Sequence, residues 1–110
     1  MNKLETKEGC IQAAMNIIGS KWTALILRDL MSGPKRFCEL EKSVDGVNPR
    51  TLTKRLVALE ANGVIAKKIY CNQPLRSDYS LTDKGRDLLP ILRAMSSWGE
   101  KYEPEPIPIS

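Results

Sequence analysis

The stretch NPRTLTKRLVALEANGVI, residues 48–65, decides how this chain folds. Its leucines recur with the spacing of one face of an α-helix, which predicts a buried apolar stripe. Asn48 can accept a hydrogen bond from a free backbone N–H, Pro49 is tolerated at the first helical position, and Gly63 ends the run. The stretch therefore predicts a helix that begins at Pro49 and whose buried side is formed by Leu52, Leu56 and Leu59.

The opposite side of this predicted helix is polar and basic. At about 100° per residue, Arg50 and Lys54 project nearly opposite the leucines. Thr51, Thr53 and Val57 flank them, and Arg55 lies nearer the rim. Arginine can bond two acceptors of guanine at once, and threonine offers both a hydroxyl and a methyl group. These residue types suit contacts with base edges and phosphates, whereas an isolated helix with this pattern would simply expose its polar face to water.

The positive charge of the chain is concentrated around this helix. The net charge is +4 over 110 residues. Residues 35–68 hold eight basic and four acidic residues, a difference of +4, whereas the rest of the chain holds nine of each and sums to zero. Excess positive charge confined to the middle of a small domain is expected of a protein that binds a polyanion, although a scattered solvated surface gives the same tally.

Further elements are predicted on both sides of the helix at Pro49. Pro90 falls inside the last of them and should kink or divide it. The predicted elements are a helix at 10–18, a helix capped by Ser20 that ends at Gly33 and Pro34, a short helix at 35–44, strands at 64–70 and 78–81 around a loop at 71–77, and a final helix capped by Thr82.

Two short helices joined by a tight turn and followed by a two-stranded hairpin form a winged helix-turn-helix. We therefore predict a mainly α fold with a small β-hairpin, extended by N-terminal and C-terminal helices. In this architecture the second helix of the pair enters the DNA major groove and the first supports it. Lys35 and Arg36, at the start of the supporting helix, are expected near the phosphate backbone. Arg76, near the hairpin tip, is expected to reach the minor groove or its phosphates.

The chain resembles a known family over almost its whole length, from about Cys10 to Tyr102. The similarity is to the HxlR family of bacterial transcription regulators, relatives of the MarR-type winged-helix proteins, and it is carried by GSKWTALILRDLMSGPKRFCEL, LTKRLVALEANGVIAKKIY and PLRSDYSLTDKGRDLLPIL. The resemblance implies a sequence-specific DNA-binding regulator that acts as a homodimer on a palindromic operator and controls detoxification or stress genes. The DNA-binding residues expected from the charge pattern and from this resemblance are Lys35, Arg36, Asn48, Pro49, Arg50, Thr51, Thr53, Lys54, Arg55 and Arg76.

Three cysteines at wide spacings suggest neither a disulfide framework nor a zinc-ligand pair. Many members of the resembled family have a cysteine at the position of Cys10, usually followed by proline, and in some it senses electrophiles or oxidants. Here Ile11 follows. If the helix begins at Cys10, its dipole and the nearby Lys7 would favour the thiolate. An oxidant sensor and an inert, partly buried thiol are both open for Cys10, whereas packing or incidental exposure is expected for Cys38, and Cys71 is expected to be exposed without a clear role.

The first and last predicted helices carry more apolar residues than so small a core readily covers. We therefore predict a symmetric homodimer built from these two helices, as the resemblance also implies. The chain would divide into an N-terminal arm (1–9), the winged helix-turn-helix domain with its dimerisation helices (10–102) and a proline-rich tail (103–110). The predicted interface residues are Ile11, Ala14, Met15 and Ile18 at one end and Leu88, Leu92, Met95 and Trp98 at the other.

The composition disfavours several classes of function. The chain has no histidine, which removes imidazole as a metal ligand and the usual general base of a hydrolytic triad. No apolar run reaches the roughly 18 residues of a membrane span, and residues 1–10 resemble no secretory signal. We therefore expect a cytoplasmic protein without catalytic activity, cofactor or metal. Two alternatives remain: a winged-helix protein interaction module, and a small thiol oxidoreductase using Cys10, although no Cys-x-x-Cys is present.

Overall fold

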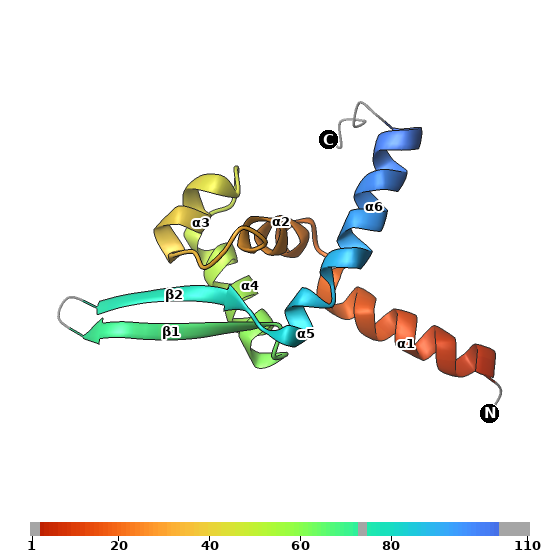
Figure 1. Cartoon of the computed structure of the whole chain (residues 1–110), viewed down its shortest axis with the longest axis horizontal. Coiled ribbons are helices and arrows are strands. Elements are labelled where there is room, and N and C mark those ends of the chain that lie inside the picture. The colour runs from red at the N-terminus through yellow and green to blue at the C-terminus, as the bar shows by residue number, and fades with distance from the viewer. Residues whose placement is uncertain (1–2, 73–74, 104–110) are drawn as a thin grey trace.

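The computed structural model describes residues 3–72 and 75–103 and has the predicted winged helix-turn-helix architecture (Figure 1). An antiparallel two-stranded hairpin extends from one side of a helical body, and the first and last helices leave the other side. The elements are α1 (Lys3–Ile18), α2 (Lys21–Leu30), α3 (Phe37–Ser43), α4 (Pro49–Ala61), β1 (Ile65–Asn72), β2 (Leu75–Leu81), α5 (Asp83–Arg86) and α6 (Leu89–Tyr102).

The core lies between α2, α3, α4 and the base of the hairpin. The predicted leucine stripe of α4 is confirmed, because Leu52, Leu56 and Leu59 are each at most 3% exposed. Branched aliphatic side chains from the other elements complete this cluster and hold α4 in place. They include Ile26, Leu27 and Leu30 of α2, Leu40 of α3, and Val44, Val64, Ile65 and Leu81.

Both ends of α4 are set by the residues that the sequence indicated. The Asn48 side chain accepts a hydrogen bond from the Thr51 backbone N–H at 2.8 Å, and Pro49 is the first helical residue. Gly63 has a φ of +74°, a conformation that favours glycine, and its N–H donates to the carbonyl of Glu60 at 3.0 Å. The α4 helix therefore has a fixed start and a sharp end before β1.

The hairpin is longer than the sequence predicts. The prediction of a loop at 71–77 is wrong, because pairing continues through Cys71 opposite Arg76 and Asn72 opposite Leu75, past an irregularity between Ile69 and Cys71. Backbone pairing extends β1 through Asn72 although asparagine rarely favours strands. The backbone of Lys35 also exchanges two hydrogen bonds with Tyr79, at 2.9 and 2.8 Å, which ties the segment before α3 to the outer edge of β2.

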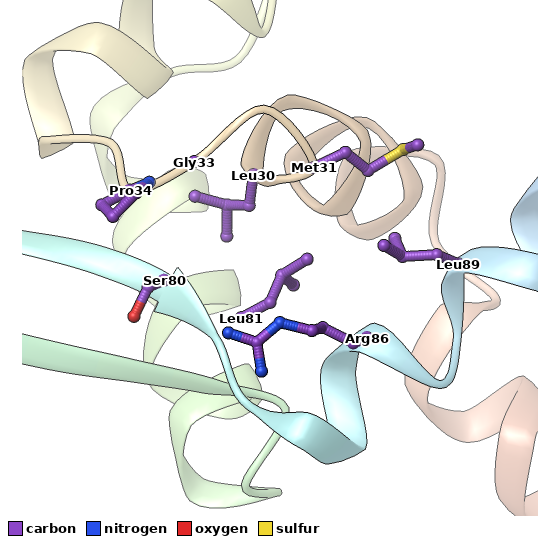
Figure 2. Close-up of a pocket in the computed structure, with 8 residues that line it drawn as sticks. All are labelled: Leu30, Met31, Gly33, Pro34, Ser80, Leu81, Arg86 and Leu89. Carbon is purple, nitrogen blue, oxygen red and sulfur yellow. The ribbon is translucent and has the colours of Figure 1, made fainter.

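Pro90 divides the C-terminal helical segment, as predicted. The short α5 is capped by Thr82, whose hydroxyl accepts from the Gly85 N–H at 3.1 Å. The backbone of Gly85 runs against the residue before β1, so that a Cβ at this position would lie 2.1 Å from the carbonyl oxygen of Val64. A small pocket of about 190 Å³ lies where the end of α2, the end of β2, α5 and the start of α6 meet (Figure 2). No residue of α4 lines this pocket, so it is separate from the basic side of that helix.

The first helix begins earlier than predicted. The expected start at Cys10 is wrong, because α1 already begins at Lys3. Leucine, glutamate and lysine in this segment are good helix formers, and one glycine inside a helix costs only about 1 kcal/mol. Within the described ranges no single helix is long and apolar enough to cross a membrane, and the pair Gly9–Ile18 and Lys21–Leu30 reaches that length only in combination, with a 76° bend between them.

Candidate nucleic-acid interface

The α4 helix exposes a polar and basic side opposite its leucines. Arg50, Thr53 and Lys54 are exposed, and we call these three residues the basic face. Thr51 and Arg55 are half-buried at the two rims of this face. The exposure pattern therefore agrees with the helical spacing, and it places two cations and a hydroxyl on one side of a helix whose other side is fixed in the core.

The cations of the basic face have no ion-pair partner in the part of the chain that the structure describes. Among the described residues, the ion pairs are Arg28–Asp29 and Arg86–Asp83, neither of which involves α4. The Nε atom of Arg55 is buried and has no hydrogen-bond partner in the described part of the chain. An unpaired buried donor is unfavourable, so this guanidinium has hydrogen-bonding capacity that the described part of the chain does not use.

The two residues that start α4 have a structural role in the helix itself. Asn48 and Pro49 are both exposed, and the carbonyl oxygen of the Asn48 side chain is already occupied by the Thr51 N–H. Only the amide nitrogen of Asn48 is left to donate to a ligand. Asn48 and Pro49 therefore fix where α4 begins, and Asn48 offers one amide donor. The positive charge comes from later residues of the helix.

The hairpin brings together two of the predicted DNA-binding residues, which the sequence analysis assigned to separate elements. Arg76 lies in β2, not in a loop, and is exposed. Arg36, at the N-cap of α3, lines the same open pocket of about 330 Å³ as Arg76, together with Phe37, Cys38 and Ser77. Lys35, which precedes them, is half-buried and bridged to β2 through its backbone. The wing and the start of α3 therefore form one continuous basic surface.

An acidic residue of the wing lies beside this basic surface. The Tyr70 hydroxyl donates a hydrogen bond to the carboxylate of Asp78, and this bond is the main cause that raises the pKa of Tyr70 above its usual value. The positive charge of Arg36 has the opposite influence on the same pKa. Asp78 thus places a negative charge on β2, two residues from Arg76. The sequence analysis did not predict the Tyr70–Asp78 pair, because only the register of the two strands brings residues 70 and 78 near each other.

The exposure of Cys38 agrees with one of the two expectations for it, whereas Cys10 is placed differently from the expectation. Cys10 and Cys38 are free thiols and both are exposed. The idea that Cys10 begins a helix is wrong, because it lies in the interior of α1, seven residues after Lys3. The effect of a helix dipole is confined to the first turn, so it does not act on this thiol. The side chain of Cys71 lies outside the described residues.

The first and last helices expose an apolar surface. Ile11, Met15, Met95 and Trp98 are 64%, 48%, 50% and 62% exposed, and Ile91 of α6 is 42% exposed. We call these five residues the apolar surface. An open apolar groove of about 340 Å³ between α2 and α6 adjoins it at Met95.

The predicted dimer-interface residues do not all belong to this surface. Ile18 and Leu88 are only 5% and 9% exposed, because they pack in the core of their own chain. These two predictions are therefore corrected, since a second chain cannot reach the side chains. Ala14 and Leu92 are half-buried.

The fold and the sequence both match known helix-turn-helix proteins. Residues 17–106 match the HxlR-like helix-turn-helix family. The chain is 42% identical over 97 residues to the HTH-type transcriptional regulator YdeP of Bacillus subtilis (strain 168), which covers 87% of this chain and 76% of YdeP.

Solved structures show the same relationship. The reduced form of the redox regulator HypR superposes with a TM-score of 0.79 at 35% identity, covering 83% of this chain and 90% of that chain. The reduced form of the transcriptional regulator YodB from B. subtilis superposes with a TM-score of 0.76 at 31% identity, covering 86% of this chain and 94% of that chain. With its winged helix-turn-helix fold, the chain belongs to the HxlR-like helix-turn-helix family of transcriptional regulators.

Proposed function

We propose that the protein regulates transcription in the cytoplasm by binding a palindromic DNA operator as a homodimer, without catalysing a reaction. The observation that carries the proposal is the basic face of α4, whose cations have no acidic partner among the described residues. The major groove admits an α-helix, and arginine reads guanine there through two acceptors. Arg76 of the wing and Arg36 before α3 would contact phosphates on either side, as would Lys35, Thr51 and Arg55 at the rims.

The homodimer is supported by the apolar surface on α1 and α6. Both helices leave the helical body on the side away from the tip of the hairpin (Figure 1). A second copy that covers this surface would leave both hairpins and both α4 helices free. For two such helices to enter successive major grooves on one side of the duplex, they must lie about 34–36 Å apart or a multiple of it.

Operator binding is testable with two matched arginine variants. Genomic fragments selected for binding supply the operator, and fluorescence anisotropy at fixed salt measures affinity for it and for random duplex. Arg50→Ala should weaken operator binding about tenfold or more, because a good bidentate contact contributes about 1–3 kcal/mol. Arg86→Ala is the control, since Arg86 is exposed and lies on neither α4 nor the wing.

Two results would contradict this proposal. If Arg50→Ala and Arg86→Ala bind the operator with the affinity of the wild type, the basic face does not read DNA. If the wild type binds no duplex more tightly than random sequence, the winged helix is better explained as a protein interaction module.

A second proposal concerns regulation by oxidants through Cys10. It is supported by the exposed, free thiol and by the similarity to HypR, whose structure is known in an oxidised and a reduced form. Diamide should release the wild type and a Cys38→Ser variant from the operator, whereas Cys10→Ser should stay bound. Equal release of all three proteins, or of none, would rule out a sensor at Cys10.

A further inference from the structure

We infer that Val57 reads the DNA sequence, by placing its side chain against the 5-methyl group of one thymine in each half of the operator. The inference rests on the proposed function, because it assigns one base contact within the α4 interface. It adds an apolar specificity element to a face that is otherwise polar.

The exposure of Val57 is the first observation. Its side chain is 60% exposed, and it is the large apolar residue that α4 leaves uncovered while its three leucines are buried. The other large apolar side chains exposed in the described part of the chain lie on α1, at the end of α2, on the wing and on α6. Val57 is therefore isolated from the apolar surface and takes no part in it.

The position of Val57 around the helix axis is the second observation. It follows Arg50 by seven residues, which at about 100° per residue leaves the two side chains about 20° apart. Along the axis they are separated by about 10.5 Å, since each residue adds about 1.5 Å. A base pair rises about 3.4 Å, so the two side chains face groove positions about three base pairs apart.

The chemistry of the major groove supplies the ligand. The thymine methyl is the apolar group that a base pair presents there, whereas cytosine offers an amino donor at its edge. An exposed branched aliphatic side chain gains by covering that methyl group and gains nothing at the other bases. Val57 would therefore select A·T or T·A at one position, about three base pairs from the guanine that Arg50 contacts.

The experiment removes the methyl group without altering base pairing. Each thymine of the selected operator is replaced in turn by deoxyuridine, and the affinity of the wild type and of Val57→Ala is measured at fixed salt. One position in each half should lose affinity for the wild type, about fourfold for one half and about fifteenfold for both, as expected for one buried methyl group. Val57→Ala should bind the thymine operator as weakly as the wild type binds the deoxyuridine operator, with no further loss when both changes are combined.

The outcomes separate the inference from the proposed function. If no deoxyuridine position distinguishes the wild type from Val57→Ala, the Val57 contact is wrong, although the wild type still prefers the operator to random duplex. If Val57→Ala shifts the monomer–dimer equilibrium in sedimentation, Val57 serves a protein contact and the inference also fails. Alanine favours helix more than valine does, so the variant is expected to fold, and circular dichroism checks this.

Discussion

The basic face of α4 and the apolar surface of α1 and α6 are both exposed helical surfaces, but the chain supports them in different ways. Behind the basic face, three leucines of the same helix are buried in the core, so the face is rigid within a single protomer. The apolar surface has weaker backing, because no residue of α6 is fully buried and its Leu89 and Leu92 pack only partly against the core. The first surface is therefore held in place by its own chain, whereas the second leaves apolar side chains exposed that the proposed homodimer would cover.

The largest effect should come from removing the support of the basic face. Leu56→Ala truncates a side chain that is 1% exposed and should lower the free energy of unfolding by about 2–5 kcal/mol. Urea denaturation measures this value. Val57→Ala on the same helix is the matched control, and its expected change is below about 0.5 kcal/mol because Val57 is exposed. Similar losses for both variants would show that α4 is not anchored by its leucines.

A substitution in the apolar surface should weaken dimerisation instead of folding stability. Trp98→Ala removes an aromatic side chain that is 62% exposed and packs against Tyr102, with ring centroids 5.2 Å apart. We expect dimer dissociation to become about thirtyfold easier, or about 2 kcal/mol, as for a central aromatic at an interface. Sedimentation at several concentrations measures it. Tyr70→Ala, an exposed aromatic on the wing, should leave the dimer unchanged, and an equal effect of both variants would contradict the assignment.

This contrast also explains what the sequence could predict. The leucine stripe, the Asn48 cap and the division at Pro90 are local patterns, and all three were predicted correctly because one helix or turn contains the whole signal. Ile18 and Leu88 were assigned to the dimer because they share a helical spacing with exposed neighbours. Whether such a residue faces its own core or another chain depends on how α1 and α6 leave the body, and the spacing alone does not contain that information.

The hairpin shows that contacts between polar residues were also beyond prediction from local sequence patterns. Arg36 and Arg76 are 40 positions apart in the sequence, and only the bridge between Lys35 and β2 brings them to one pocket. The partnership of Tyr70 with Asp78 likewise follows from strand register. Contacts of this kind are set by tertiary pairing, so a periodicity read along the chain does not reveal them.

The salt dependence of operator binding should distinguish the two surfaces further. Lys54→Ala removes one cation from the basic face, so the slope of log K against log salt for operator binding should fall by about 1 for each half-site. Trp98→Ala changes no charge, and its slope at protein concentrations that keep the dimer intact should equal that of the wild type. Anisotropy titrations over a range of salt measure both slopes, and equal slopes for Lys54→Ala and the wild type would mean that Lys54 contacts no phosphate.

The smallest effect should come from the acidic residue of the wing. Asp78→Asn keeps the shape of the side chain and an acceptor for Tyr70, but it removes a negative charge from the strand that also carries Arg76. Affinity for the operator should therefore rise by up to about fivefold, or about 1 kcal/mol, and more at low salt than at high salt. The pKa of Tyr70 should fall back toward its usual value, which an ultraviolet titration against a Tyr70→Phe control detects. Asp87→Asn, an exposed acidic residue after α5, should change neither quantity. If Asp78→Asn lowers the pKa of Tyr70 but leaves operator affinity unchanged, the carboxylate of Asp78 is remote from the phosphates of the bound duplex.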